Sequence, residues 1–295
     1  MFYIRNSITI MKRSHFITVL LLLIGSVVAQ AQVQTVYYNG LWYKLYLDRK
    51  IAVVVKKPTY KNVTITHQGK SKKKVEVPEY VIYGDPLDTE RIPCWVIGIG
   101  VEAFENNENL TEIELPETIL FIDNLAFGGC TKLKKITLPS GVRQLGGGAF
   151  FSCKSLQDIV IPDSLESIGS GAFDGCMKLK SVEWNAIRST LSPLDNDTMY
   201  IAPFNNCPKL SQFTFGEKVE YIPEFILFGN PAVKEISIPK TVTEIGDYAF
   251  AHCKKLRLVK FQNSLGTRAN QQTWFIGTRA NIESVLMPGE SVSIQ

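Results

Sequence analysis

The chain has 295 residues, of which 45% are hydrophobic and 20% are charged. It is therefore long enough to bury a large core, and its composition is not that of a disordered protein. The formal charge is +4, but three of these positive charges lie in the first 31 residues, at Arg5, Lys12 and Arg13. The rest of the chain is almost neutral, so we expect no nucleic-acid partner bound through net charge.

The N-terminal residues have the pattern of a secretory signal peptide. Lys12 and Arg13 precede an apolar run at 16–28, and Ala29-Gln30-Ala31 has the small-x-small form of a cleavage site. The run is short for a membrane span, although a retained anchor is the alternative. We expect residues 1–31 to be removed, which leaves a protein without a membrane span that is secreted or held on the outer cell surface.

A repeat of 23 residues organises most of the chain. Its clearest copy is 119–139, ILFIDNLAFGGCTKLKKITLP, and the same frame recurs on both sides of it. An Ala-Phe pair, a Cys or Asn, and the pattern L-x-x-I-x-L-P return at this interval. A fixed period of about 20–29 residues with aliphatic residues at these spacings is typical of a leucine-rich repeat solenoid.

The repeat divides the chain after residue 31 into three parts. Residues 32–95 do not follow the frame and are expected to form a β-rich N-terminal cap and linker, residues 96–261 form the array of about seven coils, and residues 262–295 form a degenerate repeat and C-terminal cap. Within the array, one interval is 31 residues instead of 23, which places an insertion in 186–200.

Two details of the cap can be predicted. Asn39-Gly40 lies between β-prone runs, a combination that favours a two-residue hairpin. Val75, Val77 and Pro78 resemble the last residues of one degenerate repeat. The segment 32–84 is basic, with a net charge of +7, while the chain from 85 onward is acidic. The basic cap either meets an acidic partner or is a solvated hairpin kept soluble by its lysines.

The template predicts the fold class. In L-x-x-I-x-L-P the last two aliphatic residues are two apart, so both point inward from a short strand and the residue between them faces out. The proline ends the strand, and the glycine after the preceding Ile suits a tight turn. We expect each strand to pair with the next in one curved parallel sheet. The predicted class is α/β, mostly β: a solenoid with a parallel sheet on one face and a β-rich N-terminal cap.

Two rows of the template are expected to be structural. The phenylalanine rings should stack from coil to coil. The Cys position also accepts Asn, which indicates a small buried group beside turn backbone, so we expect free buried thiols although a secreted protein permits disulfides. The structural positions are Phe104, Phe127, Phe150, Phe173, Phe204 and Phe250 in the first row, and Asn107, Cys130, Cys153, Cys176, Cys207 and Cys253 in the second.

The sequence contains no catalytic constellation. After residue 31 the histidines are His67 in the cap and His252 beside Cys253, and both are interpreted as surface residues. Cysteines with metal-ligand spacing are lacking, and Asp195-Asn196-Asp197 lacks the other ligands of a calcium loop. We therefore expect no enzymatic activity, no metal and no cofactor.

The unit IG-x-x-AF-x-x-C-x-x-L-x-x-I-x-LP closely resembles the BspA-like, or type 5, leucine-rich repeat family. The resemblance covers 96–261 well and 275–288 weakly, and YYNGLWYKL with VEVPEYVIY is similar to the cap that precedes such arrays. Members are typically secreted or surface proteins of anaerobic Gram-negative bacteria of the mouth and gut, and of some protozoa. Some are adhesins that bind host matrix or plasma proteins.

The resemblance implies a secreted or cell-surface, non-enzymatic protein-binding module, an adhesin for host proteins being its specific form. The alternative is a glycan-binding surface protein that uses the same face or the 186–200 insertion, with Trp184 and Tyr200 for aromatic stacking. The expected partner-binding residues face outward from the strands: Glu112, Glu114, Lys135, Thr137, Asp158, Val160, Ser181, Glu183, Gln212, Thr214, Glu235 and Lys260. We expect Ser192–Met199 to border them, and Lys72–Lys74 to affect mainly the association rate.

Overall fold

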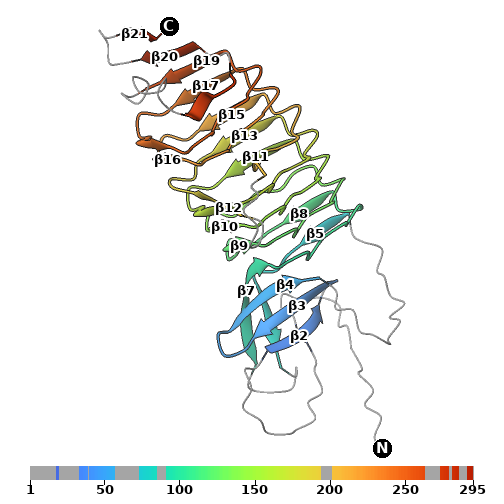
Figure 1. Cartoon of the computed structure of the whole chain (residues 1–295). Coiled ribbons are helices and arrows are strands. Elements are labelled where there is room, and N and C mark those ends of the chain that lie inside the picture. Colours follow the sequence, from blue (N-terminus) through green and yellow to red (C-terminus); the bar gives the residue numbers. More distant parts are fainter. Residues whose placement is uncertain are drawn as a thin grey trace, which may run out of the picture.

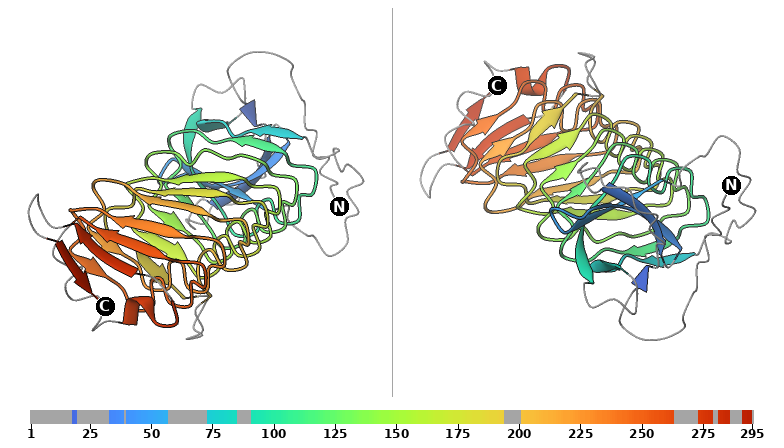
Figure 2. Two further views of the ribbon diagram at one scale, coloured as in Figure 1. Left: turned by 90° about the horizontal axis from the view of Figure 1, so that it is seen from above. Right: turned by 90° about the horizontal axis from the view of Figure 1, so that it is seen from below.

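The computed structural model describes residues 18–19, 33–38, 40–56, 73–84, 91–193, 201–262, 273–278, 281–285 and 291–294. The molecule is elongated, and its coils are stacked along one axis (Figure 1). The strands β2 (Val33–Tyr38), β3 (Leu41–Tyr46) and β4 (Ile51–Val55) form one end, and β20 (Asn281–Val285) and β21 (Ser291–Ile294) form the other. Figure 2 shows the same order of coils from above and below.

The cap is joined to the array by strand pairing. β2, β3 and β4 form an antiparallel meander, and Tyr38 lies opposite Leu41, which confirms the predicted hairpin. β4 pairs in parallel with β7 (Ile92–Ile99), which is also paired with β6 (Tyr80–Tyr83), and β6 with β1 (Thr18–Val19). β7 continues in parallel into the first coil. One sheet therefore crosses from the cap into the solenoid.

The array has two rows of parallel strands. The first row contains β9 (Phe121–Ile122), β10 (Gln144–Leu145), β12 (Ser167–Gly169) and β14 (Thr190–Ser192), and later β16 (Tyr221–Ile222) with β18 (Glu244–Ile245). The second row contains β5 (Lys74–Glu76) with β8 (Glu112–Glu114), then β11 (Asp158–Ile161), β13 (Ser181–Trp184) and β15 (Gln212–Phe215), and finally β17 (Glu235–Ile238), β19 (Leu258–Phe261) and β20. At the C-terminal end β21 is antiparallel to β20.

This arrangement confirms the mostly β solenoid with a parallel sheet, and it corrects the expectation of one continuous sheet. The second row is broken: in the second coil Ile136 and Leu138 are buried, but the only pairing there is a bridge between Glu112 and Lys135. The first row was not foreseen. It arises because successive coils of the 23-residue repeat stack in register. Any extended stretch of one coil then lies beside the equivalent stretch of the next coil, and this includes the short Val-x-x-Ile stretch. β5 pairs with β8 as predicted for a degenerate repeat.

The phenylalanines form a continuous stack through the first five coils. The ring centroids of Phe104, Phe127, Phe150, Phe173 and Phe204 are 5.0–5.2 Å apart, and successive rings are within 9° of parallel. This spacing follows from the separation of paired strands, about 4.7–4.9 Å, because each ring rises by one coil. The stack is interrupted at Leu227 and resumes where Phe250 lies 5.3 Å from Phe275.

All six cysteines are free and buried. In each of the five repeat positions the thiol contacts a backbone carbonyl of the preceding coil; Cys130 Sγ lies 3.2 Å from the carbonyl oxygen of Phe104, and Cys153 Sγ 3.2 Å from that of Phe127. Burial raises the pKa of Cys130 and of Cys253 from 9.0 to about 12. These thiols therefore stay protonated and serve as packing groups.

The glycine after Ile has a different role from the predicted one. Gly146 and Gly169 do not have positive φ; a Cβ at either would collide with the backbone of the preceding coil. Close approach of coils, not turn conformation, therefore requires them. The left-handed residues occur in the turn around the Ala-Phe pair, as at Leu125 (φ 53°) and Gly148 (φ 60°).

Candidate functional site

The predicted binding residues lie together on the outward side of the second strand row, which we name the strand face. Ten of them are exposed and Ser181 and Lys260 are half-buried. Strand register aligns them in two columns: Asp158, Ser181 and Gln212 are adjacent in one, and Val160, Glu183 and Thr214 in the other. The side chains between them, such as Ile159, point into the core. The strand face is thus a regular array of side chains on parallel strands.

Neighbouring side chains on the strand face are partly paired. Lys74 Nζ lies 2.6 Å from a carboxylate oxygen of Glu114 and 3.5 Å from one of Glu112. The hydroxyl of Ser181 donates to Asp158, and Lys260 forms an ion pair with Glu235. Exposed pairs of this kind contribute little to the stability of a fold, because water and salt screen their charges. They orient side chains more than they hold the coils together.

Lys74 belongs to this surface, which changes the expectation for Lys72–Lys74. Because the single positive charge of Lys74 lies between Glu112 and Glu114 and offsets part of their negative charge, reversing it would alter the strand face itself and not only the approach of a partner. Lys73 is exposed, and Lys72 lies outside the described residues.

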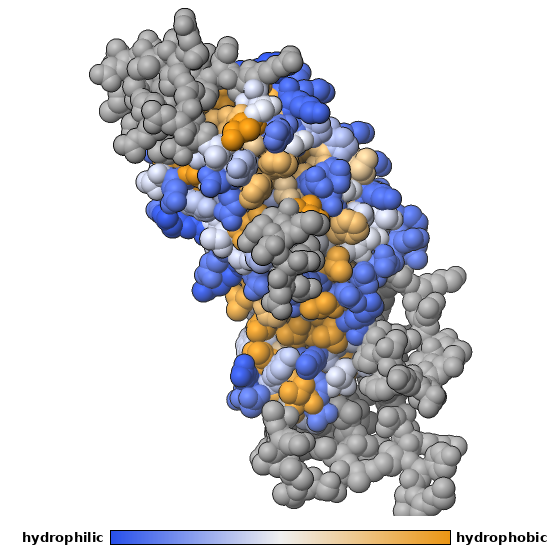
Figure 3. All heavy atoms as spheres, viewed as in Figure 1, coloured by the Kyte–Doolittle hydropathy of each residue, from blue (hydrophilic) through white to orange (hydrophobic). Residues whose placement is uncertain are grey.

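Apolar side chains also reach the surface. Val160, in the middle of the strand face, is 52% exposed, and Phe151 is 43% exposed. Figure 3 shows apolar residues at the surface along the middle of one side of the solenoid, with polar residues along its margins. A mixture of charged, polar and apolar groups is usual at protein interfaces.

The extra residues of the insertion follow β14, which is in the first strand row and not on the strand face. Ser192 pairs with Gly169, and the N–H of Gly171 donates to the carbonyl of Ile201. The residues that interrupt the 23-residue repeat therefore lie between Ser192 and Ile201. Ser170 is fully buried, and its hydroxyl accepts a hydrogen bond from the Ile201 N–H at 2.6 Å. Residues 194–200, most of the predicted border Ser192–Met199, lie outside the described residues.

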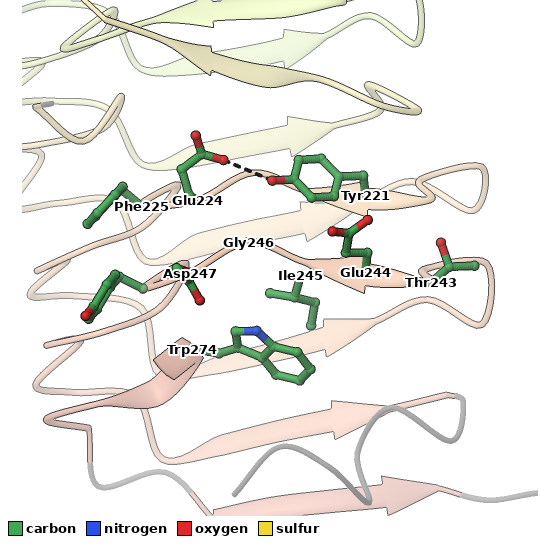
Figure 4. A pocket seen from close by; sticks show the side chains of 10 residues that line it. Tyr221, Glu224, Phe225, Thr243, Glu244, Ile245, Gly246, Asp247 and Trp274 are labelled. Carbon is green, nitrogen blue, oxygen red and sulfur yellow. Dashed lines mark hydrogen bonds between the residues drawn. The ribbon is translucent and has the colours of Figure 1, made fainter. Parts of the chain in front are cut away.

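A hollow of about 650 Å³ lies near the other end of the array, along the short sheet of β16 and β18. Figure 4 shows the rings of Tyr221 and Trp274 on opposite sides of Ile245, with Asp247 and Glu244 between them. The remaining lining residues are Glu224, Phe225, Thr243, Gly246 and Tyr248. We name this hollow the aromatic pocket.

One hydroxyl in the aromatic pocket is influenced by three carboxylates, of which one is hydrogen-bonded to it. The Tyr221 hydroxyl donates to Glu224 at 2.9 Å. Burial raises the pKa of Tyr221, and the hydrogen bond to Glu224 and the charges of Glu224, Glu244 and Asp247 raise it further. The electrostatic potential inside the pocket is therefore negative. Arg188 lies 3.8 Å from Glu244 and offsets only part of this charge.

The family can be decided by comparison with known proteins. The model of the BspA type leucine rich repeat region, in six copies, matches residues 75–200 and 195–295, which together are well over half of the chain. The chain belongs to the BspA-type leucine-rich repeat family.

Solved structures agree with this family assignment. A leucine rich cell surface protein from Faecalibacterium prausnitzii is 27% identical over 78% of this chain and 55% of its own, with a TM-score of 0.55. A leucine-rich repeat protein of T. pallidum has 24% identity over 81% of this chain and 95% of its own, also with a TM-score of 0.55, and it shows the fold alone. The chain thus spans about half the length of the Faecalibacterium protein. Among curated proteins none matches.

The BspA-type coils place few reactive groups together. Within the described residues, His, Cys, Asp and Glu do not form a group of three that could hold a metal. His252 is exposed and lies edge-on to Phe228 at 5.2 Å, and His67 is outside the described residues. In the same part of the chain, no helix is long and apolar enough to cross a membrane.

The aromatic pocket was missed by sequence reasoning, although a signal was present. Phe225 and Tyr248 occupy the position before the Ala-Phe pair or its equivalent in two successive coils, where the third and fourth coils have Gly148 and Gly171. Both aromatic residues have positive φ, 54° and 57°, and their rings stack at 5.3 Å. Bulky residues are uncommon in this conformation. Two of them in register could have indicated a specialised surface.

Proposed function

We propose that this BspA-type protein is a secreted or cell-surface protein-binding module, an adhesin for host matrix or plasma proteins, that binds through the strand face. The observation that carries the proposal is the register of the strand face, where the paired strands β11, β13 and β15 align six of the twelve candidate side chains in two columns. A rigid scaffold of this kind holds a large area of surface without ordering it on binding, which lowers the entropic cost of association.

The charge of the strand face supports a protein partner with basic groups. Its candidate residues include five carboxylates, at Glu112, Glu114, Asp158, Glu183 and Glu235, and two lysines. Lys74 and Lys260 are paired with three of these carboxylates, while Asp158 and Glu183 accept hydrogen bonds from Ser181 and Asn185. The central pair, Asp158 and Glu183, therefore has the largest share of uncompensated charge.

The alternative, a glycan on the strand face or at the 186–200 insertion, has lost part of its support. Trp184, which was expected to stack on a sugar, is 0% exposed and lies within the core. Tyr200 is outside the described residues, and the twelve candidate residues of the strand face include no aromatic side chain. Protein recognition is therefore the better-supported function for this face.

A binding assay against immobilised host matrix and plasma proteins tests the proposal. In folded protein, the double change Asp158→Lys with Glu183→Lys should weaken the strongest interaction by at least about tenfold, because it reverses the central charges of the face. The matched control, Glu108→Lys with Glu217→Lys, makes the same change of net charge at exposed positions outside the face and should leave affinity within about threefold. Equal effects of the two variants, or affinity unchanged in both, would place the interaction elsewhere.

The export of the protein is part of the proposal. The pattern at residues 1–31 predicts a cleaved signal peptide, and the similarity to a cell surface protein supports a location outside the cytoplasm. Mass spectrometry of the exported protein should find a mature N-terminus at Gln32; intact residues 1–31 on exported protein would contradict cleavage.

A further inference from the structure

The aromatic pocket has no part in the proposed function, since β16 and β18 lie in the first strand row and not on the strand face. Four of its ten lining residues are aromatic: Tyr221, Phe225, Tyr248 and Trp274. Its volume of about 650 Å³ is within the usual range for small-molecule sites, about 300–1,000 Å³. It is several times larger than one amino-acid side chain, so it fits an oligosaccharide better than a single anchor from a protein.

The carboxylates of the pocket retain hydrogen-bonding capacity. Glu224 is held through one oxygen by Tyr221, Asp247 through one oxygen by the hydroxyl of Thr273, and Glu244 approaches Arg188 through one oxygen. Each carboxylate has two oxygens, and among the described residues the second oxygen of each has no hydrogen-bond donor, so it can accept a hydrogen bond from a ligand. Oriented acceptors beside aromatic faces are suited to a ligand with hydroxyl donors and apolar C–H surfaces.

The aromatic residues of the turn point to the same use. The turn position before the Ala-Phe pair is left-handed in the first four coils, at Glu102, Leu125, Gly148 and Gly171, as well as at Phe225 and Tyr248. The positive φ therefore belongs to the repeat, and what distinguishes the sixth and seventh coils is that this position holds aromatic rings. The two rings form a stacked pair at one side of the pocket, 13° from parallel.

We propose that the aromatic pocket is a second, carbohydrate-binding site that takes a short neutral oligosaccharide. The half-buried rings of Tyr221, Phe225 and Tyr248 contact the C–H faces of the sugar, with the buried Trp274 behind them, and Glu224, Glu244 and Asp247 accept hydrogen bonds from its hydroxyls. Acidic sugars are excluded, because their carboxylates would meet three carboxylates of the protein with only Arg188 nearby as a compensating charge within the described surroundings.

Tryptophan fluorescence can test this site directly, since Trp274 forms part of its wall. The full chain is first applied to an array of neutral, amino and acidic oligosaccharides, and the strongest neutral trisaccharide on the array is then titrated in solution. We expect saturable quenching at millimolar or lower concentration, and no binding of the matching sugar in which a uronic acid replaces a hexose.

Two substitutions and one control separate binding from folding. Tyr248→Asn and Phe225→Gly put residues that tolerate positive φ at these positions, so the turn is retained while the stacked pair is lost. Each should weaken trisaccharide binding by about threefold to tenfold, the loss expected for one aromatic contact. Leu125→Asn is the matched control: Leu125 has the same template position and φ of 53° but lies outside the pocket, and its change should leave binding unaltered.

Three outcomes would overturn the proposal. Binding of no neutral oligosaccharide by the folded protein is one, and trisaccharide binding that survives both Tyr248→Asn and Phe225→Gly is another. The third is competition for the pocket by a short arginine- or lysine-rich peptide that binds more tightly than every sugar tested, which would assign the pocket to cationic protein segments. Because strand-face variants do not touch this pocket, failure of the adhesin proposal would leave these results unchanged.

Discussion

The second to fourth coils and the sixth and seventh coils use one interior template and differ at the surface. In the earlier coils the phenylalanine stack is unbroken and two of the left-handed turn positions are glycine, Gly148 and Gly171. In the later coils Leu227 interrupts the stack, Asn230 replaces the cysteine, and Phe225 and Tyr248 occupy the turn. The shape of the coil is therefore retained when residues of the phenylalanine and cysteine rows are replaced. The sixth coil, which carries these replacements, lines the aromatic pocket together with the seventh.

The largest effect we expect on both regions is loss of the fold in alkali. The pKa of Cys130 and of Cys253 is about 12 in the folded protein against 9.0 ordinarily, because burial disfavours the thiolate. Between these values the unfolded chain binds fewer protons than the folded one, so the free energy of unfolding falls as pH rises. The stability from these thiols is complete below about pH 9 and lost toward about pH 12.

Chemical denaturation from about pH 8 to about pH 11 measures this loss as a slope. Cys130→Ala should make the slope shallower, since it removes one linked proton, whereas Asn230→Ala should lower stability without changing the slope, because an amide does not titrate. Folded protein should also react poorly with thiol reagents, and denatured protein should react as six thiols. A slope of zero in the unaltered protein would contradict the protonated-thiol interpretation.

The next largest effect concerns the stack. Phe150→Ala should reduce the free energy of unfolding by roughly 3–5 kcal/mol, because it leaves a cavity between Phe127 and Phe173 that rigid coils do not fill. Phe150→Leu introduces the residue that occupies the same template position in the sixth coil, Leu227, and should reduce the free energy of unfolding by less than about 1.5 kcal/mol. Urea denaturation distinguishes them. Equal losses for the two variants would show that the sixth coil has adapted around Leu227 in a way that the third cannot.

A smaller loss of stability should distinguish the side-chain amide of Asn230 from the cysteine thiols at the same template position. The Asn230 side-chain oxygen accepts hydrogen bonds from the N–H groups of Ala232 and Val233, both at 2.9 Å. Asn230→Ala leaves these donors without that acceptor and should cost about 1–3 kcal/mol. Cys153→Ala removes one weak S–H contact and a small volume, and should cost about 1 kcal/mol. Denaturation of the two variants side by side checks the order; a larger loss at Cys153 would reverse our assignment of these roles.

The interior could be predicted from sequence because its residues recur. The Phe and Cys positions, the buried aliphatic residues and the cap hairpin follow from periodicity and local turn chemistry. The first strand row was missed because its strands of two or three residues lack the alternation of a longer strand; their pairing results from the stacking of the coils. The glycine after Ile was assigned to a turn because sequence does not show how near the preceding backbone lies.

Sites were harder to predict than the fold, because they depend on what does not repeat. The outward positions of the strand face could be predicted from the 23-residue repeat. The ion pairs of Lys74 with Glu112 and Glu114 could not, because they join residues from different repeats. Trp184 was expected to offer its ring for stacking on a glycan beside the 186–200 insertion, yet it is the last residue of β13 and is fully buried. The aromatic pocket needs Tyr221, Tyr248 and Trp274 from three coils, a combination visible only after folding.

The smallest expected effect is a gain, and it tests why the later coils keep aromatic residues in a strained turn. Ser152 has φ of 54° at the template position where Gly129 and Gly175 have φ of 73° and 74°. Ser152→Gly should raise the free energy of unfolding by about 0.5 kcal/mol, because relief of the left-handed strain slightly exceeds the added freedom of the unfolded chain. Tyr248→Gly relieves the same strain but removes the ring stacked on Phe225, so it should be neutral or destabilising. Thermal denaturation of both variants provides the comparison. Stabilisation of similar size by both would mean that the Tyr248 ring contributes nothing to the fold, and its retention at positive φ would then need a reason outside stability, which ligand binding in the aromatic pocket supplies.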